Sequence, residues 1–190
     1  MYLLSVSVIA AASIGYELLL MRLMSIIQWH HFAYMIISLA LLGFGASGTF
    51  LILAKQWLLQ RQRFSLWSLA IFFSISSILC FYLVQKIPFN PLEVPWSGLQ
   101  FIYLSINYLL LMIPFFFSAT YVGLVFIIFD KKLEKVYSFD LIGSGVGVIV
   151  FIFFLFVLKP QNCLRLIFFM GFVECAFNKP INHSFIHFSL

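Results

Sequence analysis

The sequence predicts an all-α fold, a polytopic transmembrane helical bundle of 5–6 helices. Of its 190 residues, 64% are hydrophobic and only 9% are charged, whereas about 25% of the residues in a soluble chain are charged. Apolar runs of about 20 residues recur, which is the length that a helix needs to cross a bilayer core. The strict alternation typical of a transmembrane barrel strand is absent from the sequence. We therefore expect an integral membrane protein whose immediate partner is the lipid bilayer.

The first three expected spans are separated by a short polar break and a basic loop. Residues 2–27 form an apolar run that lacks the basic start of a signal peptide and is too long to be one. The polar break 28–31 follows, and the second span, 32–54, is followed by Lys55. Residues 55–63 carry three basic residues and no acid, so we expect a loop there. The third span covers about 64–84.

The next two spans follow a proline-rich segment. Residues 86–97 contain three prolines, which break helices, so this segment is expected to be an extended loop. The fourth span, 99–129, is longer than a bilayer core at about 1.5 Å per residue. It should therefore tilt, kink at Pro114 or extend beyond the membrane. The polar connector 130–135 leads into the fifth span, 136–158.

The end of the chain is less apolar than the rest. Residues 163–177 form a candidate sixth span, although Arg165 and Glu174 near its ends disfavour it. Residues 178–190 form a polar tail that we expect to be disordered. The transmembrane domain is therefore expected to cover residues 1–177.

Basic residues are concentrated in loops that would share one side of the membrane. With the amino terminus inside, the second and fourth loops hold six basic residues, and the opposite side holds only Lys86 and Lys159. The six are Lys55, Arg61, Arg63, Lys131, Lys132 and Lys135. The positive-inside rule then predicts a cytoplasmic amino terminus. We expect the chain to be a multi-pass protein of the inner (plasma) membrane. We interpret the net charge of +5 as a signal for the orientation of the chain in the membrane and not as a phosphate-binding surface, so no nucleic-acid partner is expected.

The cysteines and histidines do not indicate a metal or cofactor site. Cys80, Cys163 and Cys175 are scattered through apolar runs and fit no metal-binding spacing. The adjacent pair His30–His31 would point about 100° apart on a helix, so both cannot readily bind one metal ion. Interfacial anchoring beside the neighbouring tryptophan is the interpretation we favour for this pair. We expect no metal and no cofactor.

Glu17 and Arg22 are ionisable residues inside the first expected span. Each would cost about 2.5–3.5 kcal/mol near the centre of a bilayer, so each should face protein, water or a partner. They are five residues apart, which places them about 140° apart around a helix. Side chains that pair on one helix are three or four residues apart. Arg22 could extend to the interface while a neighbouring helix satisfies Glu17. Alternatively, the two belong to a functional polar centre for ions, protons or a ligand.

Asp140 opens the expected fifth span. A carboxylate there could cap the helix start, where the helix dipole favours negative charge. It could also pair with Arg22, although the expected topology places the two toward opposite faces of the membrane. We hypothesise that Glu17, Arg22 and Asp140 form an intramembrane polar network that contacts a small charged ligand or a partner subunit.

Two clusters of small residues lie in the second and fifth expected spans. Gly43 and Ser47 are four residues apart, as are Gly143 and Gly147. This spacing lets helix backbones approach closely in membranes. A phosphate-binding glycine loop would instead follow a strand and open a helix in water. We therefore predict that these four residues pack helices together.

Four segments, taken in order, resemble one protein family. Residues 16–25 resemble the Tyr-Glu-x-x-x-x-Arg-Leu segment of membrane-embedded spermidine-synthase-like proteins. Residues 40–48 are similar to the glycine motif of that family's second helix, and residues 113–118 to its Pro-Phe segment. Residues 137–147 resemble its Tyr-x-x-Asp-Leu-x-Gly-x-x-x-Gly motif. The resemblance implies the multi-span amino-terminal domain of such a protein and extends to about Leu158.

In that family a cytoplasmic Rossmann-like domain follows, similar to aminopropyltransferases and to methyltransferases that use S-adenosylmethionine. Too few residues follow Leu158 for such a domain, and none of them forms a glycine-rich turn of the nucleotide-binding kind. The chain is thus expected to be truncated before the catalytic domain. No catalytic or cofactor-binding residue carries over, and enzymatic activity of this chain alone is not expected.

Two other functions fit the sequence. A small secondary transporter would share glycine-broken helices and buried charges. It should also show repeated halves, and residues 1–84 and 99–177 show no convincing repeat. A membrane anchor or assembly subunit would hold a separately encoded soluble domain or another membrane subunit.

Overall fold

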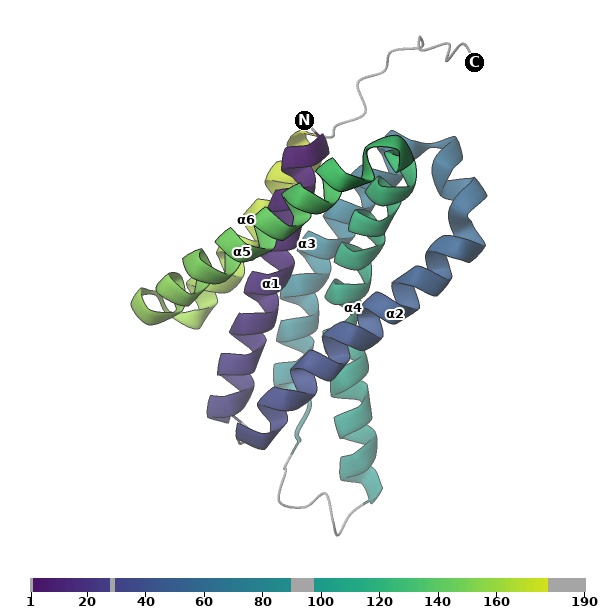
Figure 1. The fold of residues 1–190 in the computed structure, drawn as a ribbon. Helices are drawn as coiled ribbons and strands as arrows, with labels where there is room; N and C mark the ends of the chain where they lie inside the picture. Colours follow the sequence, from purple (N-terminus) through teal and green to yellow (C-terminus); the bar gives the residue numbers. More distant parts are fainter. Residues whose placement is uncertain (1, 28–29, 90–97, 178–190) are drawn as a thin grey trace.

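The computed structural model describes residues 2–27, 30–89 and 98–177, and these form a bundle of helices with no strand among them (Figure 1). The elements are α1 (Tyr2–Ile27), α2 (His30–Gln60), α3 (Gln62–Lys86), α4 (Gly98–Ile128), the short 3-10 helix η2 (Asp130–Lys132), α5 (Leu133–Val157) and α6 (Pro160–Phe177). The all-α fold class predicted from the sequence is confirmed.

Five of these helices, α1 to α5, are long and apolar enough to cross a membrane. Their outer surfaces carry large apolar side chains, such as Leu53 on α2 and Phe156 on α5, which are 82% and 83% exposed. Side chains of this kind on the outside of a bundle face lipid rather than water. The chain is therefore a multi-pass membrane protein. The shorter helix α6 is not among the five candidate spans.

Some helix boundaries differ from the expected spans. Residues 55–63 were expected to form a loop, but α2 continues to Gln60 and α3 begins at Gln62. This segment contains no glycine or proline, and its lysine, arginine, glutamine and leucine residues favour helix. Polar residues mark the membrane boundary here rather than the helix end. The predicted tail 178–190 and the predicted interfacial side chains at 29–31 lie outside what the structure describes.

Helix α1 lies at the centre of the bundle, where it packs against α5, α6, α2 and α4. Helix α4 lies between α2 and α3, and it runs through Pro114 as one continuous helix. The amino end of α1, the α2–α3 turn and η2 all lie at the same end of the bundle (Figure 1). The six basic residues of the two expected cytoplasmic loops are therefore gathered at one end, which we call the basic end.

Helices α1 and α5 run parallel and touch at four-residue intervals, with a small residue from at least one helix in every contact. The contacting pairs along the two helices are Ser7 with Gly143, Ala11 with Gly147, and Gly15 with Phe151. A Cβ atom added to Gly147 would lie 2.7 Å from the Ala11 Cα atom, and one added to Gly143 would overlap the Ser7 backbone. The two backbones thus approach closely enough to exclude any side chain at these glycines.

Helices α2 and α4 form a second parallel pair. A Cβ atom at Gly43 would lie 2.8 Å from the Phe115 Cβ atom and 3.1 Å from the Phe116 backbone nitrogen. Eight residues further along both helices, Leu51 packs against Gly123. At these contacts, a glycine of one helix lies against a large side chain or the backbone of the other helix. The bundle therefore contains two tightly packed pairs, α1–α5 and α2–α4.

A candidate ligand-binding pocket between four helices

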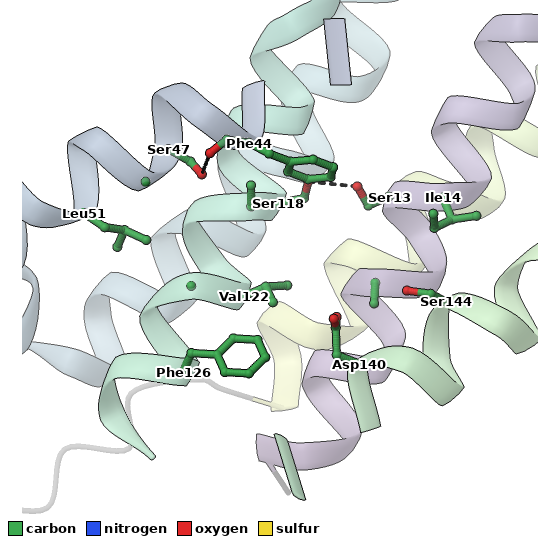
Figure 2. A pocket seen from close by; sticks show the side chains of 14 residues that line it. Ser13, Ile14, Phe44, Ser47, Leu51, Ser118, Val122, Phe126, Asp140 and Ser144 are labelled. Carbon is green, nitrogen blue, oxygen red and sulfur yellow. Dashed lines mark hydrogen bonds between the residues drawn. The ribbon is translucent and has the colours of Figure 1, made fainter. Parts of the chain in front are cut away.

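A pocket of about 490 Å³ lies between the two tightly packed pairs and is lined by α1, α2, α4 and α5 (Figure 2). Its volume lies within the range of about 300–1,000 Å³ that is usual for ligand sites. Helix α5 packs mainly on α1 and scarcely touches α4, whereas α2 packs mainly on α4. The pocket occupies the space that this arrangement leaves between the two pairs.

Most of the lining is apolar, and the polar atoms come from four serines and one aspartate. These are Ser13, Ser47, Ser118, Asp140 and Ser144. Apolar walls with a few convergent polar groups are typical of small-molecule sites. Figure 2 shows the aspartate on α5 opposite the α2 residues, with the serines distributed around the space between them.

Three of the serines use their hydroxyl hydrogens within the protein. Ser118 donates to the Phe115 carbonyl oxygen at 3.0 Å, and Ser47 donates to the Phe44 carbonyl oxygen at 2.7 Å. The Ser13 and Ser118 hydroxyl oxygens are 3.0 Å apart. Because Ser118 has given its single hydrogen to a carbonyl, Ser13 is the donor in that pair. The hydroxyls of these serines therefore offer the pocket acceptor lone pairs.

Asp140 lies two turns inside α5 and does not cap it. The helix begins at Leu133 with Lys132 at the N-cap position, and no side chain hydrogen-bonds to the cap. The expected capping role is thus wrong, because the connector residues after η2 already adopt helical geometry. The half-buried Asp140 side chain points from α5 into the pocket (Figure 2). Within the described residues, Asp140 has no hydrogen bond and no cation beside it.

Glu17 and Arg22 lie away from this pocket. Ser7 donates to the Phe139 carbonyl oxygen at 2.7 Å, which places Asp140 level with the first turns of α1. At about 1.5 Å per residue, Glu17 lies about 15 Å further along the helix axis and Arg22 about 22 Å further. In the described part of the chain, no hydrogen bond or ion pair joins any two of the three residues of the hypothesised network.

Arg22 lies instead near the other end of the bundle, close to Cys163 at the start of α6. Its guanidinium is close enough for its charge to act on that thiol. The half-buried Glu17 has no charged neighbour among the described residues. The expected alternative pairing of Asp140 with Arg22 is therefore not formed, because the two residues belong to opposite ends of the bundle.

The glycine clusters contain two kinds of position. Gly43, Gly143 and Gly147 face a neighbouring helix, as described above. Gly45 and Gly48, in contrast, have no heavy atom of another element within 4 Å of an added Cβ position. Of these two, Gly48 lines the pocket. The fourth predicted packing residue, Ser47, is 4% exposed and also lines the pocket.

The sequence reasoning did not single out three of the pocket serines. Ser144 lies four residues after Asp140, and this spacing places both on one helix face. Ser118 ends the segment 113–118, which was noted only for its resemblance. Ser13 carries no sequence signal, because a serine in an apolar helix can satisfy its hydroxyl on its own backbone.

Other buried polar groups lie outside the pocket. In the described residues, Tyr16 and Asn107 have side-chain atoms that are buried without a hydrogen-bond partner. Glu174 on α6 is 3% exposed, and it shares a hydrogen bond with Ser5, although its Oε2 atom has no partner among the described residues. None of these three residues lines the pocket between the four helices, so they do not extend the candidate site.

Two further observations bear on the role of the pocket: the comparison of the chain with known proteins, and the search for metal-binding groups among the described residues. Comparisons with known protein families, with curated proteins and with solved structures give no match for this chain. The described residues contain no group of three or more His, Cys, Asp or Glu side chains placed to hold a metal ion. The pocket must therefore be interpreted from its own geometry and chemistry.

Proposed function

We propose that this chain is the membrane domain of a spermidine-synthase-like protein and that its four-helix pocket binds a small molecule within the bilayer. One observation carries the proposal. Three of the four segments on which the resemblance rests, 40–48, 113–118 and 137–147, contribute side chains to the lining of this one pocket. Segments that are far apart in the chain thus converge on a single space.

Glycines in two of these segments also position the helices that line the pocket. Gly43 lets α2 approach α4, while Gly143 and Gly147 let α5 approach α1. Ser47 follows Gly43 on α2, and Asp140 and Ser144 lie close to these glycines on α5. Helix packing therefore holds these three polar side chains at fixed positions around the pocket. A site whose groups are fixed by helix packing binds a ligand with less loss of conformational entropy than a flexible one.

An acidic side chain in this pocket supports binding rather than a purely structural role. An ionised aspartate inside a membrane helix costs up to about 2.5–3.5 kcal/mol, so it needs a compensating interaction. Asp140 receives none from the described residues. The proposal is one of binding, and it assigns no reaction to the chain.

The proposal includes an orientation. The basic end of the bundle holds six lysines and arginines, and the positive-inside rule places such an end in the cytoplasm. The amino terminus would then be cytoplasmic, and the pocket would lie nearer the cytoplasmic surface. Asp140 is seven residues beyond the start of α5, a rise of about 10 Å.

A pocket-filling substitution tests the proposed function whatever the bound ligand is. Gly48→Leu adds a side chain to a residue that lines the pocket, at a position where an added Cβ atom meets no other heavy atom within 4 Å. Gly45→Leu is the matched control, because Gly45 lies one turn away on α2, is also free of neighbours and does not line the pocket. The three proteins are purified in a mild detergent, and the small molecules bound to each are identified by mass spectrometry.

We expect at least one small molecule to remain bound to the wild type and to Gly45→Leu and to be lost from Gly48→Leu. Loss is expected because a leucine side chain occupies volume that the ligand needs. The same set of bound molecules on all three proteins would refute the proposed binding function.

A further inference from the structure

We infer that the pocket takes a cationic amphiphile, a molecule with one ammonium head that pairs with Asp140 and a hydrocarbon body that fills the apolar walls. This inference rests on the proposed binding function and adds the chemical class of the ligand. It follows from the charge of the pocket, the direction of its hydrogen bonds and the nature of its walls.

The lining of the pocket contains one acidic residue and no basic residue. Asp140 is the one ionisable residue among those that line it, and no lysine or arginine of the described residues lies beside it. A carboxylate among apolar walls requires a counter-charge to remain ionised. A ligand that carries a single positive charge supplies it, whereas an anionic ligand would be repelled.

The hydrogen-bonding groups favour a donor on the ligand. The hydroxyl hydrogens of Ser13, Ser47 and Ser118 are used inside the protein, so these three lining hydroxyls are left as acceptors only. The carboxylate of Asp140 is also an acceptor. Ser144 is the one lining hydroxyl without a hydrogen bond among the described residues, and it can donate to the neighbouring carboxylate. An ammonium group, with N–H donors only, matches this set.

The walls favour a hydrocarbon body with one charge. Leu51 and Val122 line the pocket with aliphatic surface, and Phe44 and Phe126 add aromatic rings, whose faces attract cations. A polyamine would bring several ammonium groups, and all but one of them would lie against apolar side chains. A Ca²⁺ or Mg²⁺ ion is also disfavoured, because it takes at least about six oxygen ligands around one point, whereas the lining supplies one carboxylate and four serines distributed around the space (Figure 2).

A photoaffinity experiment compares head groups on the same hydrocarbon chain. The full chain is reconstituted in phosphatidylcholine nanodiscs and exposed to diazirine derivatives of dodecylamine and of dodecanol, with and without excess unlabelled dodecylamine. Labelled peptides are mapped by mass spectrometry. We expect saturable labelling by the amine on peptides that contain pocket residues, at least about tenfold stronger than labelling by the alcohol, as for loss of a hydrogen bond to a charged group. Excess spermidine should not compete.

Two substitutions assign the effect to the carboxylate. Asp140→Asn keeps the shape of the side chain but removes its charge, so labelling by the amine should fall about tenfold while labelling by the alcohol is unchanged. Asp130→Asn is the control, because Asp130 is exposed in η2 and does not line the pocket. It should label as the wild type does.

The outcomes separate this inference from the proposed function. If the wild type is labelled equally by the amine and the alcohol, the ligand class is wrong while binding in the pocket stands. If Asp140→Asn folds and keeps full labelling by the amine, the role of Asp140 is refuted. If Asp140→Asn does not fold, the comparison of the two probes on the wild type still decides whether the ligand class is correct. If neither probe labels the pocket and Gly48→Leu retains every co-purified molecule, both proposals fail.

Discussion

Replacing Gly143 with alanine should weaken the contact between α5 and α1 and thereby destabilise the bundle. The added Cβ atom would overlap the Cα and carbonyl oxygen of Ser7, which are backbone atoms and cannot rotate away. The two helices must then move apart where they cross. The separation would also stretch the hydrogen bond from Ser7 to the Phe139 carbonyl oxygen, which is 2.7 Å long.

The expected loss of stability follows from three contributions. Overpacking of a close contact costs about 1–3 kcal/mol, and loss of a hydrogen bond inside a membrane costs about 0.6 kcal/mol on average. Alanine has a higher helix propensity than glycine, which offsets about 0.5–1 kcal/mol. The net loss in the free energy of unfolding is therefore about 0.6–3.1 kcal/mol, a decrease of about 3- to 160-fold in the ratio of folded to unfolded protein.

Gly145→Ala is the matched control for this substitution. Gly145 lies two residues away on α5, and a Cβ atom there would meet no heavy atom of another element within 4 Å. The variant should be as stable as the wild type or more stable by up to about 1 kcal/mol. Both variants are unfolded reversibly in bicelles with sodium dodecyl sulfate, and the four tryptophans report the transition by fluorescence.

A Gly143→Ala variant that is as stable as Gly145→Ala would contradict this prediction. It would mean that the backbones of α1 and α5 do not approach as closely as described. A loss for both variants would instead indicate that glycine is required along α5 for its conformation and not for its contact with α1.

Two further predictions concern the pocket wall and the orientation. In a double-mutant cycle of Ser13→Ala and Ser118→Ala, the coupling free energy should be about 0.6 kcal/mol and below about 1.7 kcal/mol, and a coupling of zero would contradict the 3.0 Å hydrogen bond between their hydroxyls. In a variant without its own cysteines, Lys86→Cys should react with a membrane-impermeant maleimide in spheroplasts and Lys135→Cys only after permeabilisation. The reverse pattern would overturn the proposed cytoplasmic amino terminus.

The existence of the helices could be predicted from the sequence, but some of their ends could not. A bilayer leaves no partner for backbone polar groups, so an apolar run of about 20 residues must form a helix. The segment 55–63 shows the limit of this reasoning, since its charged residues leave the membrane without ending the helix. Helix ends depend on backbone geometry, which hydropathy does not record.

The glycine spacing predicted close packing but not its partners. Gly143 and Gly147 meet Ser7 and Ala11 of α1, a helix that lies far away in the sequence. Ser7, Ala11 and Gly15 are themselves spaced four residues apart, and this second set of small residues was a signal that the sequence reasoning missed. The spacing of small residues identifies one helix face, but a contact between two helices requires a matching face on each of them.

The presence of an acidic residue in an apolar span was visible in the sequence, whereas its surroundings were not. Asp140 was expected to cap a helix, yet the packing of α5 on α1 turns it into a pocket shared with α2 and α4. The free-energy cost of placing a residue in lipid depends on that residue and its position in the helix, so a membrane bundle with a few destabilising polar side chains could be predicted from the chain. Which of those side chains share a site depends on the matching surfaces of helices that are distant in the chain, and this becomes known only once the helices are packed together.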